Sequence, residues 1–290
     1  MSDVQSRIND FVLKIATVNG TGSASANGLL MKALFRMGIP VTGKNLFPSN
    51  IQGLPTWYEI RASEKGYMSR CASVDVMVAM NIQTYQKDLA EVAPGGFLVY
   101  DSTWPREKDL NRHDITVFGV PLSKMCNENF SVARVRILMK NVMYVGVLAA
   151  LLDMDLEVIK KLLQETFAAK PKLIDANLKA IMLGYDYAKE NFNCPLPVRA
   201  EAMGDNSGNI LINGNDAVGL GCVYAGATVG AWYPITPSTG VMDAFAGYCE
   251  RFRIDPETHE KRFCIIQAED ELAAAGMVIG ANWVGARGFT

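Results

Sequence analysis

The chain has 290 residues, of which 49% are hydrophobic and 20% are charged, a composition typical of folded globular protein with room for two domains. Its formal net charge of −2 gives no basis for a nucleic-acid partner or for binding to an acidic membrane surface. Residues 1–15 include charged side chains and lack the apolar core of a signal peptide, and the apolar run 142–152 is too short to cross a bilayer. We therefore expect a cytoplasmic protein with no membrane contact.

The cysteines exclude several kinds of metal site. All six are scattered singly, at positions 71, 126, 194, 222, 249 and 264, and the chain has only two histidines. None of these spacings matches a zinc or iron–sulfur ligand pattern. We expect free thiols and no metal bound by this chain, so that iron–sulfur ligands for any electron transfer must lie on another chain.

The first chemical signal is a glycine-rich turn. The segment Phe11–Val18 is apolar and β-branched and predicts a strand, and Leu29–Met37 predicts a helix. Between them lie Asn19, Gly20, Thr21, Gly22 and Ser23, the start of a small-residue stretch that ends at Gly28. A strand, a glycine-rich turn and a helix can hold a phosphate on free backbone N–H groups. The stretch lacks both the third glycine of a dinucleotide fingerprint and the lysine of a P-loop, so a simple tight turn is the alternative.

The rest of the first 192 residues alternates strand and helix patterns. Further strands are predicted at 56–62, 74–80, 97–100 and 114–119, with a helix at 84–92, and helices at 132–152, 156–168 and 173–191. Near-continuous apolar strands separated by helices favour an α/β fold, with a mostly parallel sheet covered by helices on both faces. The proline- and glycine-punctuated residues 193–208 predict a linker, which separates residues 1–192 from residues 209–290.

The second half is organised around a rigid turn, Tyr233-Pro-Ile-Thr-Pro-Ser-Thr239. Two prolines fix φ on either side of Ile235 and Thr236, and the residues after them begin a helix pattern at 241–252. The turn thus holds a hydroxyl and several backbone N–H groups at the start of a helix. A proline-rich turn without chemistry is the alternative. Downstream, a predicted buried strand from Cys264 runs into an Ala/Gly-rich helix with Glu271 near its start.

Residues 208–290 resemble the pyrimidine-binding domain of the 2-oxoacid:ferredoxin oxidoreductases, thiamine diphosphate enzymes with the signature Tyr-Pro-Ile-Thr-Pro-Ser. The resemblance implies that Glu271 is the carboxylate beside the pyrimidine ring and that the Thr236 hydroxyl faces the substrate carboxylate. It also implies that the turn binds substrate, through Tyr233, Pro234, Ile235, Pro237 and Ser238. On the residues alone, an acid that stabilises a helix N-terminus is the favoured interpretation of Glu271, and a turn hydroxyl is the alternative for Thr236.

The first half is similar to the gamma domain of the same family, a Rossmann-like domain with a glycine-rich first turn. Its loop Phe47–Leu54 and its strand Trp57–Arg61 follow the family pattern, with Gln52 in place of the usual arginine. The resemblance implies that residues 19–23 and Arg61 bind a cofactor, with coenzyme A as the candidate. The loss of the arginine charge and the altered glycine pattern argue for fewer contacts to that anion.

Together the two resemblances imply a fused gamma–alpha subunit of a CoA-dependent 2-oxoacid:ferredoxin oxidoreductase of the 2-oxoglutarate type. No Gly-Asp-Gly…Asn diphosphate anchor occurs in residues 1–290. The resemblance therefore implies a beta subunit that supplies Mg²⁺, the diphosphate end of thiamine diphosphate and a 4Fe–4S cluster, with ferredoxin as electron partner. A non-redox decarboxylase- or transketolase-like subunit and a non-catalytic scaffold are the alternatives. The family also continues beyond the equivalent of Thr290, so we expect the chain to be the N-terminal part of a longer polypeptide.

Overall fold

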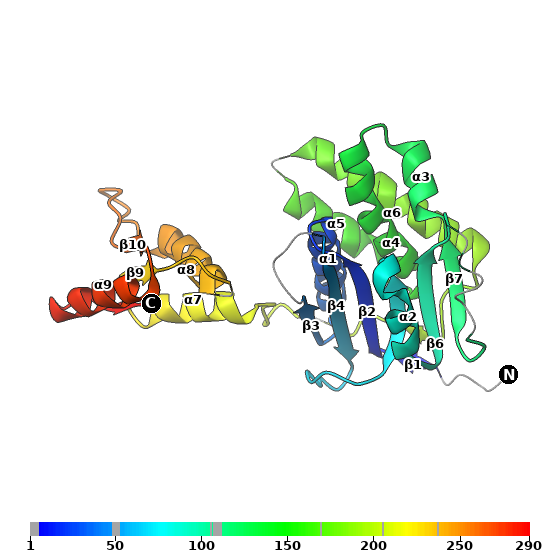
Figure 1. Cartoon of the computed structure of the whole chain (residues 1–290), viewed down its shortest axis with the longest axis horizontal. Helices are drawn as coiled ribbons and strands as arrows, with labels where there is room; N and C mark the ends of the chain where they lie inside the picture. Colours follow the sequence, from blue (N-terminus) through cyan, green and yellow to red (C-terminus); the bar gives the residue numbers. More distant parts are fainter. Residues whose placement is uncertain are drawn as a thin grey trace. The chain divides into compact units, whose positions relative to one another are not determined.

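The computed structural model describes residues 6–47, 53–104, 106, 112–168, 170–204, 206–236 and 238–290. Two compact units make up the chain, Met1–Asn209 and Ile210–Thr290 (Figure 1). Both contain helices and strands, and none of the helices in the described ranges is long and apolar enough to cross a membrane.

A six-stranded sheet forms the centre of the first unit. Its strand order is β3-β4-β2-β5-β6-β7, with the bounds Val41–Leu46, Pro55–Ser63, Asp10–Val18, Val74–Ala79, Val92–Asp101 and Thr116–Val120. β2, β5, β6 and β7 pair in parallel, whereas β4 runs antiparallel to both of its neighbours. The predicted α/β fold is confirmed. The reversed β4 follows from the short connection after β3, because a parallel crossover needs a dozen residues or more.

Helices cover the two faces of this sheet unequally. One face packs against α1 and a bundle of four further helices, with the bounds Ser23–Arg36 for α1, Leu122–Asn129 for α3, Ala133–Leu151 for α4, Leu156–Thr166 for α5 and Pro171–Asn191 for α6. The other face carries α2, Tyr85–Glu91, which follows the 3₁₀ turn Ile82–Thr84 (Figure 1). Alternation along β2 explains the division, since Leu13 and Ile15 belong to the larger core and Val12 to the smaller one.

The structure differs from the predicted start of α1. The helix begins at Ser23, so the expectation that it starts at Leu29 is wrong. Gly22 adopts a left-handed conformation, with φ of 82°, and ends the turn directly before the helix. The small side chains after it are compatible with helix, and Gly28 lies inside α1 rather than in the turn.

Residues 193–208, expected to form a linker, lie within the first unit. The short strand β8, Val198–Arg199, pairs in parallel with β1, Arg7–Ile8. Leu196 and Ala200 are buried, and their backbone N–H groups donate to the carbonyls of Leu151 and Leu152 at the end of α4. This segment therefore packs against the core of the first unit and does not form a flexible linker.

The second unit is a small parallel α/β layer. Its elements are α7 Gly214–Tyr224, β9 Val229–Trp232, α8 Ser238–Phe252, β10 Cys264–Gln267, α9 Glu271–Trp283 and β11 Gly288–Phe289. The sheet order is β10-β9-β11, and the core consists of Ala227, Met242, Phe245 and Cys249. Burial raises the pKa of the Cys249 thiol, as expected for a free cysteine in a core. β10 was expected to be buried and is mostly exposed, so that prediction is wrong for this unit.

Helices α4 and α6 of the first unit approach each other closely. Gly146 of α4 faces the backbone of α6, where a Cβ atom would overlap the carbonyl oxygen of Ile181. Gly184 of α6 faces α4 in the same way, against the carbonyl oxygen of Met143. Both glycines are needed for the two backbones to approach each other, because any side chain at either position would separate the helices.

We expect Gly146→Ala to lower the free energy of unfolding of the first unit by about 1–3 kcal/mol, the usual cost of overpacking a core. The measurement is urea unfolding followed by far-UV circular dichroism. Gly28→Ala is the matched control, since a Cβ there meets nothing within 4 Å. In a helix interior that change should stabilise by about 0.5–1 kcal/mol. Equal midpoints for the two variants would contradict the proposed role of Gly146.

Candidate active site

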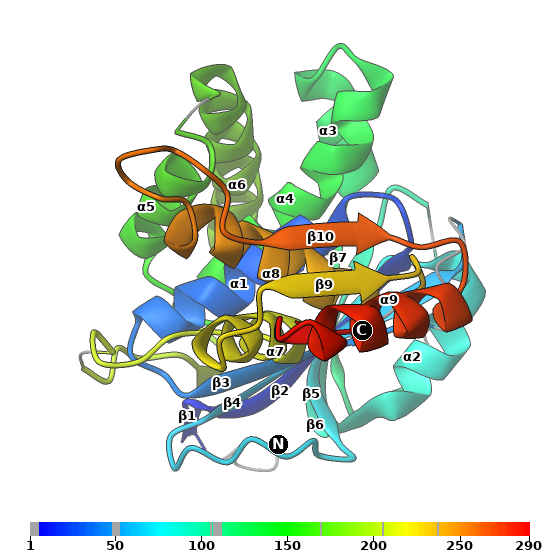
Figure 2. The same cartoon turned by 90° about the vertical axis from the view of Figure 1, so that its left-hand side faces the viewer.

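Two adjacent parallel strands bring the two motifs of the second unit to one edge of its sheet. β9 and β10 pair in register, with Trp232 opposite Gln267, and the N–H of Ala268 donates to the carbonyl of Trp232 at 2.8 Å. Figure 2 shows their arrows pointing the same way. Thr236 follows the end of β9 by four residues, and Glu271 follows the end of β10 by four residues. The carboxyl edge of a parallel sheet is the usual place for a ligand in an α/β domain.

The turn after β9 keeps one hydroxyl available for a ligand. Ser238 Oγ donates to the carbonyl of Ile235 at 2.7 Å, and the N–H of Thr239 donates to the same carbonyl at 3.1 Å. The Thr236 hydroxyl is exposed and has no hydrogen-bond partner among the described residues. Tyr233 and Ile235 are also exposed, at 38% and 53%. Of the predicted substrate-binding residues, Pro237 lies outside the described residues.

Glu271 is the first residue of α9. Asp270 caps the helix and accepts the N–H of Ala273 at 2.7 Å, which leaves the Glu271 carboxylate free of intramolecular partners within the described chain. The carboxylate is exposed, whereas a dry setting was expected. The acid is therefore not needed as the helix cap, but the described residues of this unit do not supply the apolar cover that would desolvate it.

This edge of the sheet carries both hydrogen-bond donors that favour an anion and a carboxylate that acts as an acceptor. α8 begins at Ser238 beside the free Thr236 hydroxyl, and its N-terminal backbone N–H groups favour an anion such as a carboxylate. Glu271 adds a carboxylate that can accept a proton or hydrogen bond from a ring nitrogen. This arrangement can hold a ligand that is anionic at one point and a hydrogen-bond donor at another.

The glycine-rich turn of the first unit has the geometry that the sequence predicts. Gly20 and Gly22 have φ of 86° and 82°, a region that other residues rarely adopt. No side chain caps the first N–H groups of α1, so they remain available to an anion. The Thr21 hydroxyl donates to the carbonyl of Val18 at 2.8 Å, and the Ser23 hydroxyl is buried and accepts from Thr17 at 2.9 Å. The N–H of Thr21 also donates to the carbonyl of Val18, so Thr21 has no donor left for a ligand, whereas the backbone N–H of Ser23 at the start of α1 is available.

Other residues that support this turn were not found from the sequence. The side-chain amide of Asn141, in α4, donates to the carbonyl of Thr21 at 2.8 Å. Asn141 is buried among apolar residues, and nothing in the sequence distinguishes it from other helix positions. Deeper in the core, the Tyr144 hydroxyl donates to Asn27 at 2.7 Å, and burial raises the pKa of Tyr144 so that the hydroxyl keeps its proton.

A cavity of about 460 Å³ opens beside the turn. Its lining is mainly apolar and comes from α1, α4, α5 and α6, with Lys32 as the cation among the described lining residues. A ligand with a phosphate at the turn would thus have an apolar surface next to it.

Arg61 does not lie near the turn. It pairs with Val12 on β2, whereas the turn follows Val18, about 20 Å further along the strand. Its guanidinium forms an ion pair with Asp10 at 2.5 Å and donates to the carbonyl of Ala62 at 2.6 Å. The turn and Arg61 therefore cannot bind the same phosphate group. Gln52, predicted to replace a family arginine, lies outside the described residues.

No group of three or more potential metal-ligating side chains is found in the part of the chain that the structure describes. The free carboxylate and hydroxyl of the second unit fit the ring end of thiamine diphosphate. They do not form a site for the divalent cation that anchors a diphosphate.

Comparison with known proteins agrees with the division into two units. Residues 12–187 match the family described as pyruvate ferredoxin/flavodoxin oxidoreductase, and residues 220–290 match its thiamine diphosphate-binding domain. The alpha subunit of a 2-oxoacid:ferredoxin oxidoreductase from Aeropyrum pernix is 28% identical, over 97% of this chain and 50% of its own length. Subunit KorA of a 2-oxoglutarate oxidoreductase from Mycobacterium tuberculosis is 22% identical, over 98% and 46%. The chain thus spans about half the length of these relatives.

Two solved structures extend the comparison. A 2-oxoglutarate:ferredoxin oxidoreductase from Magnetococcus marinus, with 2-oxoglutarate, coenzyme A and succinyl-CoA bound, has a TM-score of 0.82 and 28% identity, covering 97% of this chain and 47% of that one. The pyruvate oxidoreductase subunit PORC from Thermotoga maritima shares only the fold, with a TM-score of 0.51 and 18% identity over 61% of this chain and 96% of its own. Because the first family match spans more than half of its length, the chain belongs to the pyruvate ferredoxin/flavodoxin oxidoreductase family.

Proposed function

We propose that this chain is a subunit of a CoA-dependent 2-oxoacid:ferredoxin oxidoreductase. The reaction is the oxidative decarboxylation of a 2-oxoacid to its acyl-CoA and the reverse reductive carboxylation. 2-Oxoglutarate is the favoured substrate, because the 28% identical Magnetococcus marinus structure contains 2-oxoglutarate and succinyl-CoA. We also propose a cytoplasmic location.

The observation that carries the proposal is the juxtaposition of two segments at one sheet edge. Parallel pairing of β9 with β10 places the segments that contain Thr236 and Glu271 after neighbouring strand ends. Both side chains are free of intramolecular partners in the described chain. Residues with only a structural role at a turn or a helix start would be expected to bond the backbone, as Ser238 and Asp270 do.

Each residue then has a distinct role at the proposed site. Thiamine diphosphate, when bound, supplies the nucleophilic carbon and the electron sink that decarboxylation of a 2-oxoacid requires. Glu271 holds a proton in a hydrogen bond to the pyrimidine nitrogen. The Thr236 hydroxyl donates to the substrate carboxylate, and the N-terminus of α8 adds backbone donors for the same anion. Tyr233, Pro234, Ile235 and Ser238 shape the wall of the turn.

The glycine-rich turn is proposed to bind the coenzyme A co-substrate. Free N–H groups at the start of α1, after Gly20 and Gly22, suit a phosphate, and the adjacent apolar cavity suits an uncharged arm. The N–H groups of Asn19 and Thr21 donate to the carbonyls of Leu54 and Val18 and hold the turn, so Ser23 is the residue of the three that offers a backbone N–H to the ligand. Asn141 holds the turn through the Thr21 carbonyl.

Metal binding, the diphosphate contacts and electron transfer are proposed for a partner subunit. The described residues contain no metal-ligand cluster, and residues 1–290 contain no diphosphate anchor. We therefore propose a beta subunit that supplies Mg²⁺, the diphosphate contacts and a 4Fe–4S cluster, with ferredoxin accepting the electrons. The decisive experiment follows dye reduction by the assembled enzyme with 2-oxoglutarate, with and without CoA. Turnover without electron transfer would contradict the redox assignment.

We expect the 290-residue chain alone to bind thiamine diphosphate only weakly, because one hydrogen bond to the ring cannot replace the diphosphate contacts. Calorimetric titration in the presence of Mg²⁺ measures this directly. Stoichiometric binding in the micromolar range without a partner would show that the chain holds the diphosphate itself.

Thr236→Val should weaken 2-oxoacid turnover by the loss of one hydrogen bond to a charged carboxylate, about 1–3 kcal/mol, with folding unchanged. Specificity constants of the assembled enzyme provide the measurement. Thr116→Val is the matched control, since Thr116 is exposed on β7 and its hydroxyl has no partner in the described chain. Wild-type kinetics for the Thr236 variant would identify Thr236 as a turn residue only.

Glu271→Gln tests the proton role most sharply, since glutamine retains the volume but not the charge. We expect turnover to fall by about 10²-fold or more, the scale of a positioned proton-transfer group, while thiamine diphosphate stays bound. If the acid serves only the helix N-terminus, the loss is at most about 1 kcal/mol of stability. The readout is hydrogen–deuterium exchange at the thiazolium carbon in the assembled enzyme.

The control for this variant is Glu269→Gln, the same charge change two residues earlier in the same exposed connection. It should exchange at the wild-type rate. An equally fast exchange in Glu271→Gln would remove Glu271 from the mechanism.

A further inference from the structure

The α2 side of the first unit's sheet carries a charged area that the proposed reaction does not use. Directly opposite residues in paired strands share a face. The register pairs Lys44 of β3 with Glu59 of β4, and Glu59 with Lys14 of β2. Two residues further along β4, and so on the same face, Arg61 lies opposite Thr42 of β3. α2 covers the β5 side of this face, and its contacts to β3 and β4 are few.

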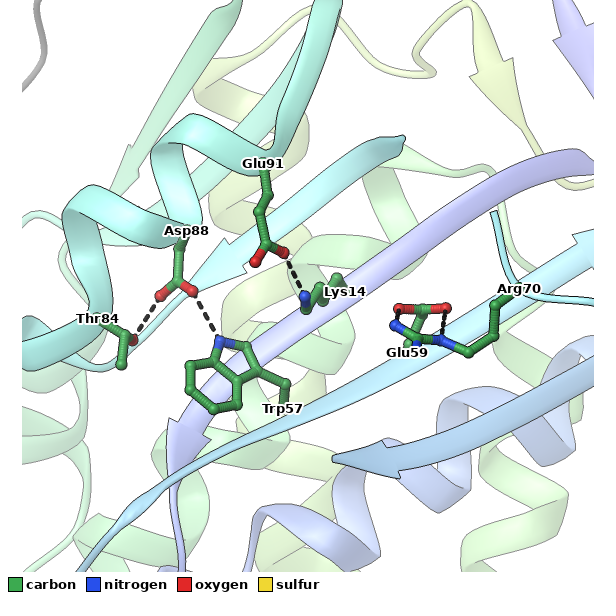
Figure 3. Close-up of polar contacts among 7 residues, drawn as sticks. All are labelled: Lys14, Trp57, Glu59, Arg70, Thr84, Asp88 and Glu91. Atoms are coloured by element: carbon green, nitrogen blue, oxygen red, sulfur yellow. Dashed lines mark hydrogen bonds and ion pairs between the residues drawn. The ribbon is translucent and has the colours of Figure 1, made fainter. Parts of the chain in front are cut away.

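Most charges in this area are already paired. Figure 3 shows the guanidinium of Arg70 forming a fork with the buried carboxylate of Glu59, at 2.7 and 2.6 Å. In the same view, Lys14 forms an ion pair with Glu91 of α2. Nearby, Asp88 accepts hydrogen bonds from Trp57 and Thr84, and its burial raises its pKa. The carboxylates are thus satisfied by neighbouring donors.

Lys44, Arg61 and Arg70 line a hollow of about 270 Å³ between the two strands and the loop that follows β4. Its lining contains three cations and one carboxylate. The lining residues are Thr42, Gly43, Lys44, Glu59, Arg61, Met68 and Arg70. Asp10 pairs with Arg61 and Glu59 with Arg70, so Lys44 is the lining cation that no carboxylate of the described residues neutralises.

Several donors in the hollow have no partner within the described residues. The ammonium of Lys44 and the hydroxyl of Thr42 make no hydrogen bond or ion pair. The Nε of Arg61 is buried and unpaired, although its other nitrogens bind Asp10 and the carbonyl of Ala62. Nε and Nη2 of Arg70 donate to Glu59, and Nη1 remains available as a donor to a ligand. Lys44 and Arg70 are exposed, so the Nε of Arg61 is the buried donor of this group that an acceptor would satisfy.

We propose that this hollow binds a phosphate group through Lys44, Arg61, Arg70 and Thr42. Glu59 occupies Nε and Nη2 of Arg70, and the remaining donors approach from β3, from β4 and from the loop. Donors from several directions match the oxygens of a tetrahedral anion better than those of a planar carboxylate. The site lies on the opposite face of the sheet from α1, and it needs no thiamine chemistry.

The shared chemistry allows two sources, free phosphate or the phosphate of a nucleotide. Both are tested by calorimetric titration of the full 290-residue chain in low-salt buffer, first with inorganic phosphate and then with adenosine 3′,5′-bisphosphate. We expect saturable phosphate binding that weakens about tenfold in Lys44→Gln. A nucleotide source is indicated if the bisphosphate binds more tightly than phosphate and also weakens in that variant. Free phosphate is indicated if it does not.

The matched control is Lys161→Gln, which also removes one exposed lysine but lies on α5 and lines neither this hollow nor the cavity beside the glycine-rich turn. Its affinity for phosphate should stay within twofold of the wild type. Thr42→Val provides a second, uncharged test of the same hollow and should also weaken binding. The proposal is overturned if the wild-type chain shows no saturable heat up to about 10 mM phosphate, if Lys44→Gln binds like the wild type, or if Lys161→Gln loses binding to the same extent as Lys44→Gln.

Discussion

Parallel strand pairing is the constraint on which both candidate sites depend. When neighbouring strands run the same way, the segments that follow them leave at the same edge, and each helix that begins there presents free N–H groups. In the second unit this brings the turn after β9 beside the start of α9. In the first unit it places the glycine-rich turn after β2 at the edge where β5 and β6 also end. The candidate functional residues thus lie in the segments between strands and helices, and the strand pairing determines which of these segments lie side by side.

Local features were predictable because they depend on neighbours in sequence. The glycines at 20 and 22, the start of α8 at Ser238 and the start of α9 beside Glu271 follow from turn and capping preferences. Long-range features were not. The reversed direction of β4, the pairing of β8 with β1 and the distance between Arg61 and the turn are set by register between remote segments, about which residue type says little.

The strand Trp57–Arg61 shows where a pattern misleads. Its alternation predicts one solvated face, yet Glu59 is only 4% exposed and the Arg61 side chain only 11%. Alternation of apolar and polar residues shows which side chains are polar and does not show which are exposed. A polar side chain can be buried when hydrogen-bond or ion-pair partners are present. Here the partners come from the loop that carries Arg70 and from Asp10 at the start of β2. Such compensation is invisible in a single strand's sequence.

The exposure of Glu271 bears on how the active site is completed. A carboxylate in water is stabilised as the anion by solvent and shares a proton with a ring nitrogen poorly, whereas a desolvated one shares it readily. The described residues leave Glu271 open, with Leu272 and Trp283 of the same helix 83% and 89% exposed. If Glu271 holds the proposed proton, water must be excluded from it by polypeptide other than the residues described. The activity then depends on assembly for its electrostatics as well as for its electron path.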